Sequence, residues 1–241
     1  MTRHRAFAKI PVFDRWAFPL LIAGALGLAA YGWLRSHPEY NPWAPLDLDD
    51  PPGWATQRKV AALRDDPAEC RAVLVRSQVA FSALAPAGEG ACTRADRTVL
   101  SDSPLSPASP PTTCAVAAAL SRWIEQSVKP AAREFLGADL AQIEHLGAYS
   151  CRRLYGRGSG PWSEHATGNA IDIAGFILAD GTRVSVLRDW DGDGPEAKFL
   201  HRVHAGACWA FGTVLGPEYN AAHADHLHLD QQARGWGAVC R

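Results

Sequence analysis

The 241-residue sequence predicts an α+β protein in which one N-terminal apolar helix precedes helices packed on a small antiparallel sheet. Three observations support this prediction. An apolar run lies near the N-terminus, segments with helical periodicity follow it, and segments with strand-like alternation lie toward the C-terminus together with one late helix. The length suits one or two domains, and a hydrophobic content of 47% is enough for a sizeable core.

The apolar run covers residues 16–34 and is expected to form a transmembrane anchor. Its 19 residues are within the range that can span a bilayer, and aromatic residues lie near both of its ends. Residues 1–15 are basic, so the positive-inside rule predicts that they stay in the cytoplasm. The rest of the chain is then periplasmic, beyond the cytoplasmic (inner) membrane. Cleavage of the segment as a signal peptide, near Ala29 and Ala30, is the alternative.

Charge is distributed unevenly along the chain. Residues 1–35 hold five Lys+Arg and one Asp, a net charge of +4, so the remainder holds 19 Lys+Arg and 24 Asp+Glu, a net charge of −5. An acidic body gives no electrostatic reason to expect nucleic acid as a partner.

Cysteine usage agrees with export. The six cysteines all follow the predicted anchor, and no C-x2-C pair, which would favour a zinc site, occurs among them. We expect three structural disulfides, or two disulfides and a free pair. Six cysteines allow 15 pairings, and the sequence does not choose among them.

Residues 35–66 are expected to form a stalk and a leading helix, ahead of a domain that covers residues 67–241. The stalk, residues 36–53, is rich in proline and acidic residues, which resist regular structure. Residues 54–78 predict two short helices, interrupted before Pro67. Residues 101–113 form a polar, proline-rich loop.

Helical periodicity is clearest over residues 114–128, with Thr112 or Thr113 as the expected cap. Pro130 is expected to begin a second helical segment that Gly137 closes. A later helix is predicted over residues 195–212, with proline near its start and glycine at its end.

Four strands are predicted from alternating apolar residues and flanking turns. They cover residues 142–151, 169–175, 181–187 and, as the last strand, 226–230.

Two of these strands carry polar residues in an unusual pattern. In the sequence NAIDIAG, Asp172 lies between Ile171 and Ile173, so the carboxylate is on the face opposite the isoleucines. In the sequence HLHLD, His226, His228 and Asp230 share one face, and two leucines share the other. If the two strands are neighbours with their aliphatic faces toward the core, Asp172, His226 and His228 converge. His165 then returns to the same place through the turn that follows it.

Two imidazoles and one carboxylate with an open fourth position are typical of a catalytic zinc site. A metal ion would also offset the partial burial of Asp172. The alternative is that Asp172 caps a turn and the histidines lie on an exposed face. Asp225 and Asp230 are candidate hydrogen-bond partners of the histidines around the metal.

The same stretches resemble a known family. SEHATGNAIDI is similar to the S-x-H-x-x-G-x-A-x-D segment of zinc peptidases of the lysostaphin, D-alanyl-D-alanine carboxypeptidase and hedgehog type, and HADHLHLD is similar to their terminal H-x-H strand. The segments AYSCRRLYG, SEHATGNAIDIAGF and FGTVLGPEYNAAHADHLHLD together resemble the extensin-like C-terminal domain family. The resemblance covers about residues 67–241 and does not include the anchor.

The resemblance implies roles for individual residues. His165, Asp172 and His228 match the ligands of Zn²⁺, and His226 matches a catalytic residue that is a glutamate in the carboxypeptidases and a histidine in the murein endopeptidases. His223 matches a further site histidine of the endopeptidases, and Arg152 matches an arginine that steadies the substrate carbonyl. Apart from the resemblance, Glu164 precedes a ligand and is a candidate substrate contact; the alternative is that it only faces water.

These residues imply a membrane-anchored zinc-dependent peptidase that acts on peptidoglycan peptides, of the D,D-carboxypeptidase or endopeptidase type. The alternative function is that of a non-catalytic, zinc-stabilised module that binds the cell wall. The sequence predicts no oligomeric state.

Overall fold

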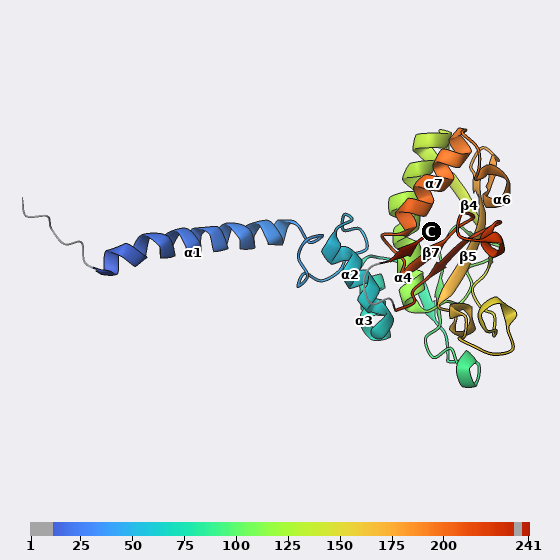
Figure 1. The fold of residues 1–241 in the computed structure, drawn as a ribbon, viewed down its shortest axis with the longest axis horizontal. Helices are drawn as coiled ribbons and strands as arrows, with labels where there is room; N and C mark the ends of the chain where they lie inside the picture. Colours follow the sequence, from blue (N-terminus) through green and yellow to red (C-terminus); the bar gives the residue numbers. More distant parts are fainter. Residues whose placement is uncertain (1–11, 234–237) are drawn as a thin grey trace, which may run out of the picture.

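The computed structural model describes residues 12–233 and 238–241 of the chain (Figure 1). A single long helix, α1 (Val12–Ser36), extends away from the body. Its stretch Trp16–Ser36 is long and apolar enough to cross a membrane, and none of it is buried against the rest of the described chain. This helix fits the predicted single-pass anchor. Most of the expected cytoplasmic segment, residues 1–11, lies outside the described residues.

Residues 37–53 have no helix or strand, as their prolines predict, but they are not a free-standing stalk. Leu46 and Leu48 are buried in a cluster with α2 (Trp54–Ala62) and α3 (Pro67–Arg76). The buried guanidinium of Arg122 donates a hydrogen bond to the Leu48 carbonyl at 2.6 Å. The prediction of a separate stalk was wrong because it weighed the prolines and acidic residues and overlooked the two leucines.

Side-chain caps fix where two of the helices before the sheet begin, and Thr113 is one of the two predicted caps. The Asp66 carboxylate accepts hydrogen bonds from the backbone N–H groups of Ala68 and Glu69, so α3 starts at Pro67. Thr113 caps α4 (Cys114–Trp123) through its hydroxyl.

Pro130 does not begin a new helix, contrary to the prediction. The helix that starts with α4 continues through two π-helical turns, Ile124–Val128 and Ala132–Leu136, with α5 (Lys129–Ala131) between them. The wider π turn before the proline accommodates a residue that lacks a backbone N–H. The helix ends at Gly137, as predicted.

The main sheet has seven strands in the order β3-β4-β5-β8-β7-β9, with β6 paired to β5. Its predicted members are β4 (Leu140–Gly147), β5 (Ala170–Leu178), β6 (Arg183–Ser185) and β8 (Leu227–Asp230). The strands β3 (Leu105–Ser106), β7 (Thr213–Leu215) and β9 (Val239–Cys240) were not predicted, because two or three residues show no periodicity.

These additions correct two expectations. The sheet is mixed, since β3 pairs with β4 and β9 pairs with β7 in parallel, and β8 is not the last strand. A separate antiparallel pair, β1 (Phe81–Ala83) and β2 (Thr98–Leu100), lies beside the helices. The late helix α7 (Pro195–Ala207) ends five residues before the predicted Gly212, and a short helix, α6 (Val186–Asp189), precedes it.

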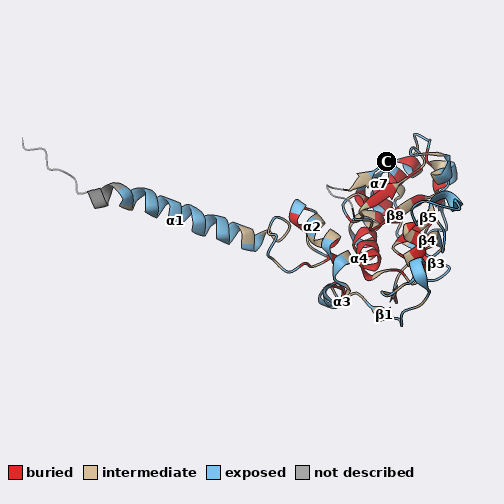
Figure 2. Ribbon diagram, turned by 60° about the horizontal axis from the view of Figure 1, so that its bottom comes forward, coloured by how far each residue is buried: buried red, intermediate tan, exposed pale blue. Residues whose placement is uncertain are grey.

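The core lies between the sheet and the pair α4 and α7 (Figure 2). Fully buried aliphatic residues of β5 and β8 lie in one cluster with Trp123 of α4 and Phe199 of α7, and the Trp123 indole N–H donates to the Val203 carbonyl of α7 at 2.8 Å. On the other side of α4, the small residues Ala115 and Ala118 allow α2 and α3 to pack closely. The layers are therefore α2 with α3, then α4 with α7, then the sheet. The outer face of the sheet is left for a site.

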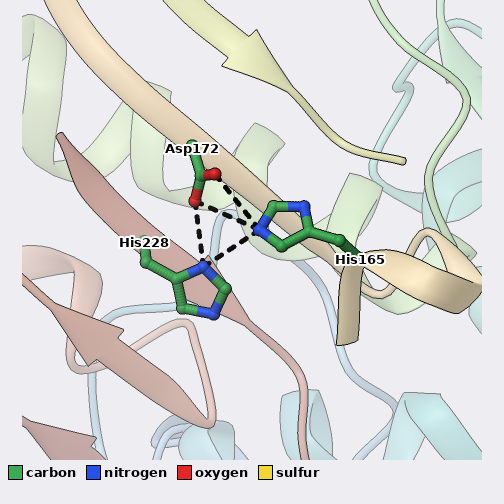
Figure 3. A group of neighbouring side chains, drawn as sticks. All are labelled: His165, Asp172 and His228. Atoms are coloured by element: carbon green, nitrogen blue, oxygen red, sulfur yellow. Dashed lines mark hydrogen bonds and ion pairs between the residues drawn. The ribbon is translucent and has the colours of Figure 1, made fainter. Parts of the chain in front are cut away.

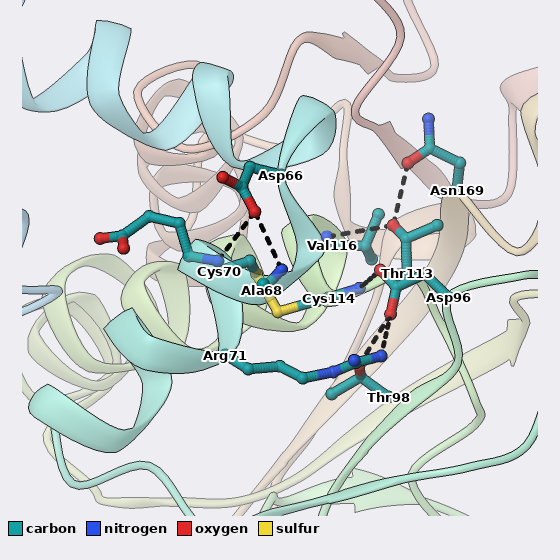
Figure 4. The surroundings of a disulfide bond; sticks show 11 residues. Asp66, Ala68, Cys70, Arg71, Asp96, Thr98, Thr113, Cys114, Val116 and Asn169 are labelled. Atoms are coloured by element: carbon teal, nitrogen blue, oxygen red, sulfur yellow. Dashed lines mark hydrogen bonds and ion pairs between the residues drawn. A yellow bond between two sulfur atoms is a disulfide. The ribbon is translucent and has the colours of Figure 1, made fainter.

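All six cysteines form disulfides, Cys70–Cys114, Cys92–Cys151 and Cys208–Cys240, which suits an oxidising compartment. The first joins α3 to the start of α4 (Figure 4). Around it, the Asp96 carboxylate accepts from the Cys114 backbone N–H at 2.5 Å and from the Arg71 guanidinium at 2.9 Å.

Removal of the Cys70–Cys114 disulfide is expected to destabilise the fold without rearranging the side chains on the outer face of the sheet. The bond closes a loop of 44 residues, and such cross-links contribute about 2–4 kcal/mol, chiefly by restricting the unfolded chain. Denaturant unfolding of Cys70→Ala/Cys114→Ala, compared with the unchanged protein, measures the loss. An unchanged free energy of unfolding would contradict this account.

Candidate metal centre

The two strands that carry the polar pattern are neighbours, as predicted. Asp172 of β5 lies directly opposite His228 of β8, and Ile171 and Ile173 pair with Leu229 and Leu227. All four aliphatic residues are fully buried. Since side chains alternate along a strand, Asp172 and His228 share the outer face.

A short 3-10 turn, Glu164–Thr167, brings His165 to the same face. The Ser163 hydroxyl accepts a hydrogen bond from the His165 backbone N–H at the start of the turn. Gly168 ends the turn in the left-handed conformation at a φ of 73°, which glycine adopts without steric cost. The chain therefore reverses within three residues and enters β5.

This turn is also fixed to the start of α4. The Asn169 amide donates to a Glu164 carboxylate oxygen at 2.6 Å, and the Thr113 hydroxyl donates to the Asn169 side-chain oxygen at 2.9 Å. The predicted substrate contact Glu164 lines the cleft, and this bond to Asn169 also makes it a positioning residue for the His165 turn. Its contact with substrate stays a prediction.

His165, Asp172 and His228 point toward one another (Figure 3). His165 Nε2 lies 3.2 Å from the Asp172 carboxylate and 3.1 Å from His228 Nδ1, and His228 Nδ1 lies 2.9 Å from Asp172 Oδ1. The three candidate ligand atoms are within 4.8 Å of one another. The structure thus brings together the three residues predicted as ligands.

In His165 and in His228, the ring nitrogen that points away from Asp172 is hydrogen-bonded to an acceptor. His165 Nδ1 donates to the Ala148 carbonyl at 3.2 Å, and His228 Nε2 donates to Asp230 at 3.0 Å. In the neutral imidazole, the inner nitrogen then carries a lone pair. Two lone pairs and a carboxylate therefore face one point without a donor between them, so the site favours a cation, either a proton or a metal ion.

The ionisation of the site follows from this arrangement. Burial opposes the charged form of Asp172, but hydrogen bonds with His165 and His228 outweigh burial and hold the pKa of Asp172 well below its usual range. Burial alone would lower the pKa of His228, whereas its contacts with Asp172 and Asp230 raise that pKa to about 9. Without a metal ion, a proton on His228 supplies the cation.

His226, the predicted catalytic residue, lies at the edge of this cluster. Its Nε2 is 3.5 Å from Asp172 Oδ1, and its Nδ1 is hydrogen-bonded to Asp225 at 2.7 Å. Asp225 and Asp230 thus both contact site histidines, as predicted, although Asp225 holds His226 rather than a ligand.

His223 lies next to His226, with ring centroids 5.3 Å apart and ring planes tilted by 42°. Burial and the neighbouring histidines lower the pKa of His223 to about 4, so it is neutral at pH 7. It is held by a hydrogen bond between its Nδ1 and the Asn220 side-chain oxygen at 2.8 Å.

The cluster lies in a cleft of about 200 Å³. Arg152 lines the cleft next to Cys151, whose disulfide with Cys92 fixes this rim. Tyr155 and Tyr219, which were not predicted, also line the cleft. Tyr155 accepts a hydrogen bond from Asn220 at 3.3 Å and joins two sides of the cleft. The glycines that follow Tyr155 indicate a loop, which is the signal that could have drawn attention to an aromatic residue there.

A larger cavity of about 360 Å³ lies elsewhere, between Leu48, Ser77 and α4. Among the described residues, the one group of three or more His, Cys, Asp or Glu side chains placed to hold a metal ion is the one in the smaller cleft. Chemistry rather than size therefore identifies the site.

Comparison with known proteins identifies a family for most of the chain. No curated protein and no solved structure matches the chain. Residues 68–241, which contain the whole cleft and all six cysteines, match the family described as Extensin-like protein C-terminus. Because this match covers well over half of the chain, the protein belongs to the Extensin-like protein C-terminus family.

Proposed function

We propose that the protein is a membrane-anchored zinc-dependent peptidase that acts on peptidoglycan peptides. The observation that carries this proposal is the cluster of two inward lone pairs and one ionised carboxylate, open to a cleft, with a further histidine beside it. A closed structural site would need a fourth protein ligand and no cleft.

Zinc fits the residues present. Imidazole and carboxylate are common zinc ligands, and three protein ligands with one open position are typical of catalytic sites. The carbonyl of Ala148 and the carboxylate of Asp230 fix the ligand tautomers in the way that metal sites require. When bound, zinc would supply a Lewis acid that polarises a peptide carbonyl and lowers the pKa of a coordinated water.

The side chains around the ligands have matching tasks. Asp225 accepts the Nδ1–H of His226, so His226 Nε2 has a lone pair that faces the ligands and can take a proton from the attacking water. His223 is neutral and can hydrogen-bond to substrate. Arg152 would place its guanidinium at the carbonyl of the bond that is cut.

The wall-peptide substrate rests on the stretches that resemble zinc peptidases of the lysostaphin and D-alanyl-D-alanine carboxypeptidase type, and on the compartment. Three disulfides suit an oxidising environment, and the basic segment before α1 favours an orientation with the N-terminus in the cytoplasm. In this proposal the domain is periplasmic and anchored in the inner membrane. In this proposal the protein acts as a D,D-carboxypeptidase or as an endopeptidase.

Zinc affinity is expected to rise with pH. The proton on His228, with a pKa near 9 in the metal-free protein, occupies the position of the metal and must leave when zinc binds. Apparent affinity should therefore increase about tenfold per pH unit between roughly pH 6 and 8, with about one proton released. Chelator competition and titration calorimetry in two buffers measure both quantities. A flat pH profile would show that no proton competes for the site.

The hydrogen bond from His228 to Asp230 gives a second test of the site. Asp230→Asn keeps the shape of the side chain but weakens its hold on the ligand, so zinc affinity should fall about 10–100-fold. Asp180→Asn, in a surface turn after β5, is the matched control and should leave affinity unchanged. Equal affinities for the two variants would argue against His228 as a ligand.

Variants of His228 and His226 distinguish an enzyme from a binding module that does not cut. His228→Ala should lose zinc and hydrolysis together, whereas His226→Ala should keep zinc and reduce turnover about 10²–10⁴-fold, the usual contribution of a general base. Digestion of purified sacculi by the full chain in detergent, with the products identified by mass, measures turnover and names the bond. If the unchanged protein binds wall peptides and cuts none, the peptidase proposal fails and the binding module is favoured.

The proposed orientation is tested by reporters. A reporter fused to the C-terminus that is active only after export should be active, and the fusion should stay in the membrane fraction at full length. A soluble product that starts near Tyr31 would show that α1 is removed as a signal peptide.

A further inference from the structure

Exposed aromatic residues gather where α1 meets the body of the protein. Trp33, near the end of α1, stacks on Tyr40 with ring centroids 5.5 Å apart. Tyr40 is 37% exposed, Trp43 is 82% exposed, and Trp54, the first residue of α2, is 47% exposed. We call Tyr40, Trp43 and Trp54 the collar. Three large exposed aromatic side chains at one place usually mark a surface with a partner.

The collar is joined tightly to the body. The Ala55 backbone N–H donates to the Glu39 carbonyl at 3.1 Å, and the Lys59 ammonium donates to the Pro38 carbonyl at 3.1 Å. At Gly53, a Cβ atom would lie 2.4 Å from the Glu39 carbonyl oxygen, so only glycine allows this approach. The segment that carries Tyr40 and Trp43 is therefore part of the body.

The level of the collar follows from that of α1. The apolar stretch that can cross a membrane ends at Ser36. Tyr40 follows four residues later, and Trp54 lies at the start of α2, which is hydrogen-bonded to the backbone at Glu39. Tyrosine and tryptophan are enriched at the depth of the lipid headgroups, where a ring with one polar group is partly solvated. We infer that the collar is an interaction surface for the phospholipid headgroup layer of the membrane that holds α1.

The charges near the collar indicate how it would bind. The Lys59 ammonium lies 3.9 Å from the Asp50 carboxylate and is also attracted by Glu39, so these charges near the collar offset one another. Attraction to anionic lipids is therefore not required. The contact would depend on the aromatic rings, would form with zwitterionic phospholipid and would change little with salt.

This contact fixes the direction of the cleft. Helix α2 lies next to α1, and α4 separates α2 from the sheet (Figure 1). Asp172 is on the face of β5 opposite the isoleucines that pack toward α4. With the collar on the bilayer, the cleft opens on the far side of the body, away from the membrane. This inference rests on the anchor and is independent of zinc or hydrolysis.

The experiment uses the full chain in phosphatidylcholine nanodiscs, with one added cysteine that carries a fluorophore. Pro42→Cys places the probe within the collar and keeps its three aromatic residues, Leu26→Cys places it within α1, and Leu187→Cys, on exposed α6, is the distant control. Nitroxide-labelled lipids should quench positions 26 and 42 and leave position 187 bright, at low and at high salt. Trp43→Ser/Trp54→Ser should remove the quenching at position 42, whereas Leu187→Ser should not.

Each other outcome overturns the inference. Quenching at position 26 without quenching at position 42 would show an anchor whose collar stays in water. No quenching at position 26 would remove the anchor and the collar together. Quenching at position 42 that survives loss of both tryptophans, or that disappears at high salt, would show that the aromatic rings are not the contact. Zinc content, measured on the same samples, keeps these results separate from the proposed peptidase.

Discussion

The pairing of Asp172 with His228 across β5 and β8 is the constraint on which the rest of the site depends. The same register that sets these two polar residues side by side buries Ile171 and Ile173 against Leu229 and Leu227 on the opposite face. A slip of one residue would expose the aliphatic side chains and bury the charged ones. The hydrophobic core therefore specifies the geometry of the candidate metal centre, and no separate device is needed to align its strands.

His165 depends on a different support. It comes from a short turn, and its position is set by hydrogen bonds that run from Glu164 through Asn169 to Thr113. Thr113 is also the cap of α4, so the best-packed helix of the fold holds the turn that carries the third candidate ligand. The rim of the cleft is fixed in turn by the Cys92–Cys151 disulfide. A sheet, a helix cap and a disulfide each fix one part of the site.

The sequence alone predicted what periodicity and local chemistry determine. The alternation around Asp172 and His228 predicted their shared face, and Thr113 was one of two residues predicted to cap α4. Short strands such as β3 and β9 escaped prediction because two residues carry no pattern. Disulfide pairing and the docking of residues 37–53 depend on distances between remote segments, which spacing along the chain does not contain.

The protonated state of His228 allows the site to form without a metal ion. In the metal-free protein, the protonated ring of His228 lies between Asp172 and Asp230, so the carboxylates already have a cationic partner. The fold itself is held by a continuous core and three disulfides, none of which includes a candidate ligand. In small zinc-dependent folds the metal supplies the folding free energy. Here the strands, the tautomers and the cleft are in place beforehand, and a metal ion would replace one proton in a site that the rest of the chain has already built.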